Sequence, residues 1–454
     1  MVEKVSEIRL DDPQLKVPNI KVEPPGPNGK EIVERDTKYI ATSTKTAPVA
    51  AKRAKGVVVE DVDGNLYLDF TSGVGVINTG HCHPKIVQAI QKQAGELMHF
   101  AGTDYYYDVQ VKLAEQLTKI TPGNYDKKVF YTSSGTESVE AAIKIARWAT
   151  QRKQFIAFIG AFHGRTMGSL SLTGSKVVHK ERFFPTMPGV THIPFASCYR
   201  CPYKLEYPSC DIWCAKIIDE LYLTTFLPPN EVAAIFMEPV QGEGGYIVPP
   251  KEFVKEVSKI AQKHGILFVA DEVQAGFGRT GKWFGMEHHE VVPDVITMAK
   301  ALGSGIPIGA VVYNSKYDFQ VSGAHSNTYG GNLVACASAL ATIDVIKEEK
   351  LLENATKVGA YFKKRLEELQ NKHEVIGDVR GLGLMLAADF VKDRKTKEHA
   401  TKLRDKIEEI AYKKGLLLLG CGKSAIRFIP PLVVTEKQID AAIEVLDQSI
   451  KEAQ

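Results

Sequence analysis

The sequence lacks several features that would place it in large classes of protein. No apolar stretch is long enough to cross a bilayer, and the charged residues 1–14 contain no apolar signal core. Basic and acidic residues are almost balanced, at 57 and 54, so the formal net charge is only +3. That balance offers nothing distinctive to nucleic acid or to an anionic membrane. We therefore expect a cytoplasmic protein with neither a nucleic-acid partner nor a membrane partner.

The seven cysteines are not the even set that a fully disulfide-bonded secreted protein needs. Four of them cluster in one segment, as Cys198, Cys201, Cys210 and Cys214. Their spacing allows a zinc or iron–sulfur site or a local disulfide, but it matches no strong metal template. We expect buried or capping thiols in an inserted loop and no metal, with a four-cysteine metal site as the alternative.

The pattern of apolar residues divides the chain into three regions. Residues 1–70 contain a proline-rich, charged arm and then a hairpin around the turn Asp63-Gly64-Asn65. Residues 71–345 alternate strands with helices, which predicts a doubly wound, mostly parallel sheet. Residues 346–454 combine amphipathic helices with short apolar strands. We predict an α/β fold with a large sheet domain and a smaller C-terminal α+β domain, against which the arm and hairpin pack.

Two apolar runs of the middle region each carry a charged residue at or near the C-terminal end. Residues 266–274 are ILFVADEVQ and residues 294–303 are DVITMAKALG. Ligands of an α/β sheet bind at the edge where such strands end. A lysine beside a carboxylate suits pyridoxal phosphate, because the amine binds the cofactor and the carboxylate keeps its pyridine nitrogen protonated. Lys300 and Asp271 are therefore the candidate catalytic residues, the alternative being a strand that ends in a solvated lysine.

A run of small residues, SSGTES at positions 133–138, lies between an apolar run and a predicted helix. Backbone N–H groups at such a helix N-terminus stabilise a phosphate. The same residues can serve as a helix N-cap, with Glu137 in the first turn. The two roles are compatible, so the segment is a candidate phosphate site in either case.

Two longer segments, DEVQAGFGRTGKWFG at 271–285 and PDVITMAKALGSGIPIGA at 293–310, resemble the signature of class III aminotransferases. This family is a branch of the fold-type-I pyridoxal phosphate enzymes. The resemblance extends from about residue 57 to residue 434, with the motifs in the family's order. It implies a fold-type-I architecture with pyridoxal 5'-phosphate as cofactor. In particular, the chain resembles archaeal aminotransferases that act on 4-aminobutyrate and ornithine.

The resemblance implies roles for residues around the cofactor. Asp271 would pair with the pyridine nitrogen, Gln274 would bind the ring hydroxyl, and Phe162 would stack on the ring. Thr328 would reach the phosphate of the neighbouring subunit, so the protein would form a homodimer, or a dimer of dimers, with shared active sites. The cofactor-binding residues implied in this way are Ser134, Gly135, Thr136, Phe162, His163, Glu238, Asp271, Gln274, Lys300 and Thr328.

Four charged residues are candidates for binding the substrate. The guanidinium group of Arg165 suits a carboxylate. The resemblance implies that Arg427 binds the α-carboxylate of amino acids and that Glu243 gates the substrate. Asp104, in the segment TDYYY, either pairs with the second amino group of a diamino acid or, with Thr103, caps the following helix.

The predicted activity is transfer of an ω-amino group, from ornithine or 4-aminobutyrate, to 2-oxoglutarate. Racemisation of an amino acid on the same fold is the alternative, since the cofactor motifs do not separate the two reactions. Arg165, Glu243 and Arg427 favour the transaminase, because a racemase of neutral amino acids needs no second carboxylate site. Animal-type ornithine enzymes carry a tyrosine where this chain has TKT at 44–46, so we do not expect ornithine to be recognised by that route.

Overall fold

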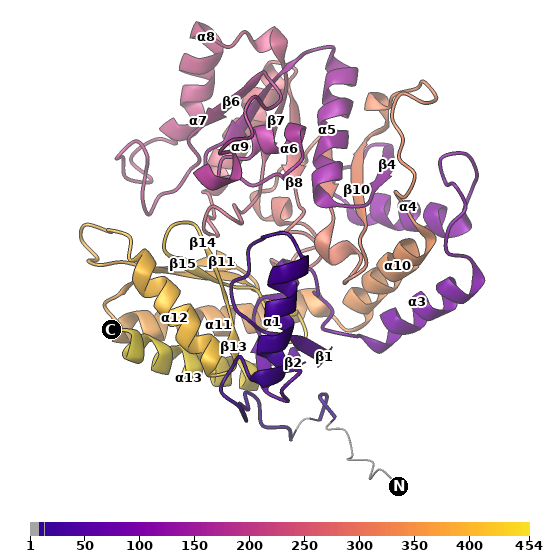
Figure 1. Cartoon of the computed structure of the whole chain (residues 1–454). Coiled ribbons are helices and arrows are strands. Elements are labelled where there is room, and N and C mark those ends of the chain that lie inside the picture. The colour runs from indigo at the N-terminus through magenta and orange to yellow at the C-terminus, as the bar shows by residue number, and fades with distance from the viewer. Residues whose placement is uncertain (1–8, 13) are drawn as a thin grey trace.

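The computed structural model describes residues 9–12 and 14–454 (Figure 1). Residues 1–8 and 13, which belong to the predicted arm, lie outside the described residues. The described part contains a seven-stranded sheet and two four-stranded sheets. None of its helices is both long enough and apolar enough to cross a membrane.

The seven-stranded sheet has the order β4-β10-β9-β8-β7-β5-β6. Strand β10 is antiparallel to both of its neighbours, and all other neighbouring pairs are parallel. Every residue of β7, β8 and β9 is buried, as expected for strands that are covered on both faces. The strands are β4 (Lys127–Thr132), β5 (Gln154–Phe158), β6 (Val190–Ile193), β7 (Val232–Met237), β8 (Leu267–Asp271), β9 (Val295–Met298) and β10 (Gly309–Asn314).

Two separate clusters of apolar side chains cover the faces of this sheet. Phe155 and Ala157 of β5 pack in the cluster that contains α5, whereas Ile156 and Phe158 pack in the cluster that contains α9. Successive residues of a strand point to opposite faces, so α5 and α9 lie on opposite sides of the sheet. The helices of this region are α2 (Ser72–Gly75), α3 (Pro84–Glu96), α4 (Asp108–Ile120), α5 (Gly135–Thr150), α6 (Met167–Leu172), α7 (Trp213–Ile217), α8 (Leu223–Thr225), α9 (Lys251–Lys263) and α10 (Leu333–Glu348). Short 3-10 turns are η1 (Val177–His179), η3 (Pro229–Glu231), η4 (Gly285–His289), η5 (Lys300–Leu302) and η6 (Ser315–Tyr317), and η2 (Ile218–Tyr222) is a π-helical turn.

The C-terminal part contains an antiparallel sheet of order β11-β12-β15-β14. Its strands are β11 (Ile376–Leu382), β12 (Met385–Phe390), β14 (Leu419–Cys421) and β15 (Ala425–Phe428), and its helices are α11 (Leu351–Lys372), α12 (Thr401–Lys413) and α13 (Glu436–Ala453). The third sheet joins the two ends of the chain, because β13 (Leu416–Leu417) pairs in parallel with β3 (Leu66–Asp69) of the N-terminal hairpin. The other N-terminal elements are α1 (Pro27–Tyr39), β1 (Ala51–Lys55) and β2 (Val58–Asp61).

The predicted α/β fold is confirmed: a large, mostly parallel sheet is accompanied by a smaller antiparallel one. The hairpin predicted around Asp63-Gly64-Asn65 is formed by β2 and β3. The alternation of strands and helices expected over residues 71–345 is also observed, as in the succession of α5, β5 and α6.

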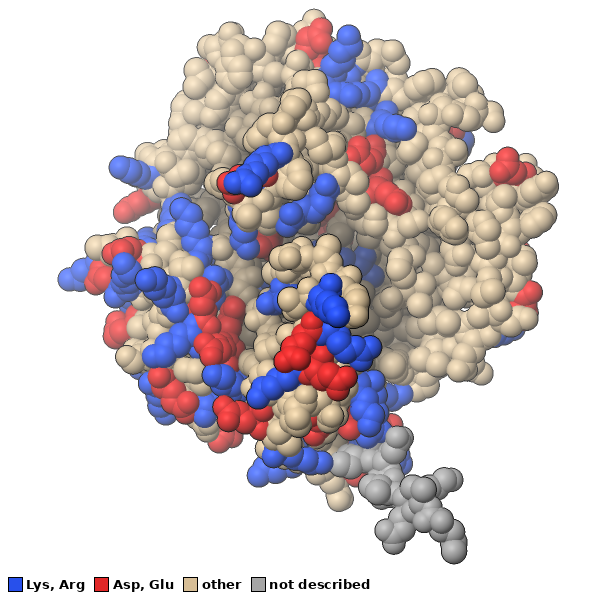
Figure 2. Space-filling model, viewed as in Figure 1, with Lys and Arg blue, Asp and Glu red and all other residues tan. Residues whose placement is uncertain are grey.

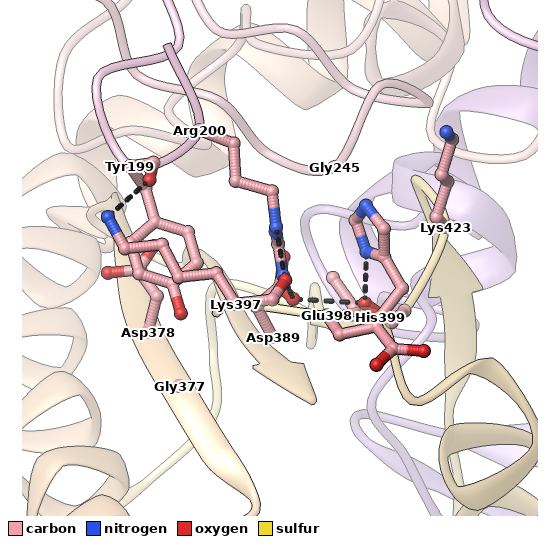
Figure 3. A network of polar contacts seen from close by, with 12 residues as sticks. Tyr199, Arg200, Gly245, Gly377, Asp378, Asp389, Lys397, Glu398, His399 and Lys423 are labelled. Atoms are coloured by element: carbon pink, nitrogen blue, oxygen red, sulfur yellow. Dashed lines mark hydrogen bonds and ion pairs between the residues drawn. The ribbon is translucent and has the colours of Figure 1, made fainter. Parts of the chain in front are cut away.

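The loop that carries the clustered cysteines is tied to the small sheet by ion pairs (Figure 3). Arg200 of this loop donates from both terminal nitrogens to the two carboxylate oxygens of Asp389 on β12, at 2.9 Å each. Lys397 donates to the carbonyl oxygen of Tyr199 at 2.8 Å. Arg380 on β11 also donates to Asp389, at 3.0 Å, and to the carbonyl oxygen of Gly245 in the large part, at 2.9 Å.

The four clustered cysteines are free thiols, and the expectation of buried thiols is wrong: Cys198 is exposed and the other three are only partly buried. Burial, with the neighbouring thiols, raises the pKa of Cys214 to about 12, so this thiol stays protonated at neutral pH. Within the described part of the chain, no group of three or more His, Cys, Asp or Glu side chains is arranged to hold a metal ion. The structure therefore gives no support to the four-cysteine metal site.

Candidate active site

A cavity of about 1500 Å³ lies where the large sheet, the small sheet and residues 44–49 meet. In the space-filling view, the surface is hollowed beside the N-terminal segment (Figure 2). Typical ligand pockets hold roughly 300–1000 Å³, so this cavity has room for a cofactor together with a substrate. Twelve of the fourteen candidate site residues line it, namely Ser134, Gly135, Thr136, Phe162, His163, Arg165, Glu238, Glu243, Asp271, Gln274, Lys300 and Arg427.

Lys300 begins the turn η5 after β9 and adopts a left-handed backbone conformation with φ of +37°. Such a conformation is strained for a residue with a side chain, and strain of this kind concentrates at functional sites. Burial lowers the pKa of the Lys300 amine below its ordinary value, and the nearby Asp271 carboxylate only partly opposes this effect. A lowered pKa increases the fraction of free amine, which is the nucleophilic form.

Asp271, the last residue of β8, is buried and contacts His163. The Asp271 Oδ2 and His163 Nδ1 atoms lie 2.7 Å apart, and Asp271 Oδ1 accepts from the backbone N–H of Val273 at 3.1 Å. Burial disfavours a charged imidazole, but the hydrogen bond and charge of Asp271 outweigh it and raise the pKa of His163. The carboxylate therefore has a fixed orientation and a neighbour whose charged form is favoured.

Glu238 connects two loops that line the cavity. One oxygen accepts from the backbone N–H of Phe162 and the other from that of Gly242, at 3.0 Å each. Burial raises the pKa of Glu238 to about 7, with the His163 charge acting in the opposite direction. Glu238 thus fixes the loop of Phe162 against the loop that leads to Glu243.

The N-terminus of α5 faces the cavity at the segment predicted to hold a phosphate. The Ser134 hydroxyl accepts from the backbone N–H of Glu137 at 3.3 Å, so the capping role is present. A Cβ atom on Gly135 would lie 2.9 Å from the Val273 side chain, so glycine allows the helix to approach the loop after β8. The Thr136 hydroxyl accepts from the backbone N–H groups of Arg165 and Thr166, at 3.2 Å each, and so positions the Arg165 loop.

Glu243 and Arg427 form an ion pair in the wall of the cavity. The Glu243 Oε2 and Arg427 Nη1 atoms are 3.1 Å apart, although the residues lie on different parts of the fold. The other oxygen, Oε1, lies 2.5 Å from the Nζ atom of Lys176. Burial would raise the pKa of Glu243, but Arg427 and Lys176 outweigh it and lower this pKa. Sequence analysis missed Lys176, because a lysine in the segment GSKVVHKER looks like any solvated lysine.

Arg165 lines the same cavity but its side chain is exposed. Its guanidinium carbon lies 5.6 Å from the centre of the Phe162 ring, which packs edge-on against His179. Residues 44–46, where animal-type ornithine enzymes carry a tyrosine, also line the cavity. The chain therefore has no aromatic side chain at that position of the wall.

Asp104 and Thr328 do not line the cavity of their own chain. Asp104 accepts a hydrogen bond from the Thr103 hydroxyl at 2.9 Å, and Thr328 is exposed in the loop before α10. The suggestion that Thr103 or Asp104 caps the next helix is wrong. Helix α4 begins at Asp108 with Tyr107 as its N-cap, because residues 101–105 first form a separate turn.

Comparison with known proteins agrees with this geometry. The family model for "Aminotransferase class-III" matches residues 39–450. A 5-aminovalerate aminotransferase of Pseudomonas aeruginosa is 43% identical, over 89% of this chain and 94% of its own length. An alanine/serine racemase of Pyrococcus horikoshii is 38% identical, over 96% of this chain and 94% of its own. The structure of an (S)-enantioselective omega-transaminase from Thermomicrobium roseum superimposes with a TM-score of 0.87 at 32% identity, covering 93% of this chain and 98% of that one.

The fold and the site define a fold-type-I pyridoxal phosphate enzyme. The chain belongs to the class III aminotransferase family, and its cofactor is pyridoxal 5'-phosphate. The cavity fits this cofactor: within the described part of the chain, the buried Oε1 atom of Gln274 has no hydrogen-bond partner, as expected of a group that receives a ring hydroxyl. When bound, the cofactor withdraws electrons from the carbon that carries the reacting amine.

Proposed function

We propose that this enzyme transfers the ω-amino group of a donor such as ornithine or 4-aminobutyrate to 2-oxoglutarate, giving a semialdehyde and glutamate. The supporting observation is that Glu243 is paired with Arg427 in the cavity that Arg165 also lines. A donor that reacts through its terminal amine brings no α-carboxylate to this end, and Glu243 then neutralises Arg427. In the second half-reaction, glutamate places its α-carboxylate on Arg427 and its side-chain carboxylate on Arg165.

The chain's own residues divide the remaining work. The Lys300 amine holds the cofactor and moves the proton at the carbon that bears the reacting amine. Asp271, oriented by His163, keeps the proton on the pyridine nitrogen, and the N-terminus of α5 holds the phosphate. Two relatives support an ω-amino donor, since 5-aminovalerate carries its amine at the end of the chain and the structural neighbour is named an omega-transaminase.

Racemisation is the second candidate, because a relative that aligns with 96% of this chain is an alanine/serine racemase. A racemase and a transaminase can share the cofactor residues. The two differ in what the cavity must hold: neutral amino acids present one carboxylate, whereas glutamate presents two. Arg165 and Arg427 both line this cavity, which favours the substrate with two carboxylates.

The two candidates are separated by incubating the holoenzyme with a panel of amino donors, with and without 2-oxoglutarate. We expect glutamate to form from ω-amino donors only when 2-oxoglutarate is present. Chiral chromatography of the same reactions should show no D-amino acid. Formation of D-amino acid from the L-form without any oxo acid would instead establish the racemase.

Replacing Glu243 by alanine should shift reactivity from the ω-amine of the donor towards its α-amine. The change leaves Arg427 without its carboxylate, so it becomes free to attract the wrong end of ornithine. We expect the ratio of ω- to α-transamination to fall about tenfold or more, since truncating one partner of a buried charge pair typically costs a few kcal/mol. The measurement is product analysis with ornithine as donor. Glu398→Ala, which removes an exposed carboxylate paired with Lys392, is the matched control, and full ω-selectivity in Glu243→Ala would contradict the role of Glu243.

The proposed active site is shared between two subunits. Thr328 is exposed and does not line the cavity of its own chain. Asp104 is likewise exposed and outside that cavity. Exposed apolar side chains surround both residues, namely Leu97, Met98, Phe100, Tyr105, Tyr106 and Tyr329. Few charged side chains appear on the side of the molecule where α3 and α4 lie (Figure 2). A surface of this kind suits a second copy of the chain, to whose cofactor and substrate Thr328 and Asp104 would be supplied.

Subunit mixing tests this arrangement. Lys300→Ala and Thr328→Asp should each be inactive as homodimers, because the first lacks the amine and the second repels the phosphate. When the two are co-expressed in equal amounts, half of the dimers are hybrids with one complete site, so about a quarter of wild-type activity should return. A fully active monomer, or no recovery in purified hybrid dimers, would contradict the shared site.

A further inference from the structure

We propose that Lys176 is a positioning residue that holds Glu243 while Arg427 binds a substrate carboxylate, and that Lys176 thereby sets the affinity for α-carboxylate substrates. The proposal rests on the proposed function, because it concerns the half-reaction in which glutamate occupies Arg427. The proposal adds Lys176 to Glu243 and Arg427, the pair proposed to distinguish the two half-reactions.

The geometry of Glu243 carries the proposal, since each of its oxygens has a different cation. Oε2 lies 3.1 Å from Arg427 Nη1, and Oε1 lies 2.5 Å from Lys176 Nζ. Among residues 9–12 and 14–454, only these two cations form ion pairs with Glu243. A substrate carboxylate that takes Arg427 therefore breaks one contact of Glu243 and leaves the other intact.

The two cations differ in how far they can move. Arg427 lies on β15 within the small sheet, and its side chain is only 9% exposed. Lys176 lies in a loop just before η1, and its side chain is 39% exposed. A flexible four-carbon stem lets the lysine follow a carboxylate that shifts, whereas the buried arginine stays in place to receive the substrate.

Arg427 also has unused capacity for a second carboxylate. Its Nε atom is buried and has no hydrogen-bond partner within the described part of the chain. A guanidinium group can bind a carboxylate through two parallel N–H donors, and the closest contact of Glu243 is to one terminal nitrogen, Nη1, at 3.1 Å. A substrate carboxylate can therefore begin to bind before Glu243 has left.

The energetic role of Lys176 follows from the burial of Glu243, whose side chain is 17% exposed. Separating a largely buried carboxylate from its only cation is strongly unfavourable. The second cation removes most of that penalty, because Glu243 remains paired throughout the exchange. Without Lys176, glutamate would have to displace Glu243 from its last partner, and it would bind more weakly.

Single-turnover measurements on the holoenzyme test the proposal, with the two half-reactions followed separately by the change in cofactor colour. In Lys176→Gln, we expect the apparent Kd for L-glutamate to rise about tenfold, as for a pair that is neither fully exposed nor fully buried. The limiting rate and the apparent Kd for an ω-amino donor should change less than about twofold. Lys176→Arg should restore glutamate binding, and Lys255→Gln, which breaks a surface pair with Glu290, should behave as wild type.

A double-mutant cycle with Glu243→Gln shows whether Lys176 acts through Glu243. If it does, adding Lys176→Gln to Glu243→Gln changes glutamate binding no further. A further loss in the double variant would mean that Lys176 contacts the substrate directly, and unchanged glutamate binding in Lys176→Gln would mean that it has no part; either result overturns the proposal. Failure of every ω-amino donor with the wild-type enzyme would refute the proposed function instead, while the glutamate measurements would still test Lys176.

Discussion

Lys300→Ala should abolish turnover and remove the yellow colour of the bound cofactor. The substitution removes the amine that we propose to hold the cofactor and to move the proton. We expect a fall in kcat of at least about a thousandfold, because covalent and acid–base contributions are lost together. Steady-state assays and the visible spectrum of the purified variant measure the two effects.

The folded state should survive this change, which makes the result interpretable. Burial of the Lys300 amine is unfavourable, as its lowered pKa shows, and alanine removes that buried polar group without changing the backbone. When both proteins are compared without cofactor, thermal unfolding of the variant should therefore match or exceed that of the wild type. Lys392→Ala, which removes an exposed lysine, should remain yellow and fully active. A Lys300→Ala enzyme that kept a near-wild-type rate would refute the central assignment.

Asp271→Asn should lower kcat by roughly two to four orders of magnitude while some cofactor stays bound. An amide cannot keep the pyridine nitrogen protonated, so the ring accepts electrons poorly. The amide also removes the negative charge that His163 contacts at 2.7 Å, so the pKa of His163 should fall. Rate measurements, with NMR titration of the imidazole, would detect both consequences.

The adjacent Glu272 provides the control for Asp271→Asn. Its oxygens accept from the backbone N–H groups of Gly285 and Met286, at 2.9 and 2.7 Å, and it does not line the cavity. Glu272→Gln should therefore lower the free energy of unfolding and leave kcat little changed. Equal losses of activity in the two variants would mean that Asp271 is only a structural residue.

Much of the fold and the position of the site could be predicted from local patterns. Strands β8 and β9 are apolar runs; β8 ends with Asp271, and β9 ends two residues before Lys300. Because β8 and β9 are parallel neighbours, their C-terminal ends lie at the same edge of the sheet, and Asp271 and Lys300 are therefore expected there. The SSGTES segment was equally informative, because small residues before a helix indicate both a cap and an anion site.

Other features depend on long-range packing that no local pattern reveals. Lys176 and Glu243 are 67 residues apart, and nothing around Lys176 marks it as different from a surface lysine. The capping role suggested for Thr103 or Asp104 was wrong because residues 101–105 form a separate turn before α4, although threonine and aspartate are good capping residues. Thr328 and Asp104 lie outside the cavity of their own chain, which the residues beside them in the sequence do not indicate.

The junction around Asp389 bears on how the protein unfolds. Asp389 is almost fully buried and binds both Arg200 of the cysteine loop and Arg380 of β11, so separating the small sheet from that loop would break the pair with Arg200 and leave Asp389 with Arg380 alone. In addition, the parallel backbone pairing of β13 with β3 links the C-terminal part of the chain to the N-terminal hairpin. These contacts couple the two parts of the molecule, so we expect the two parts to unfold together. Calorimetry should record one cooperative transition, and the calorimetric enthalpy of that transition should equal its van't Hoff enthalpy.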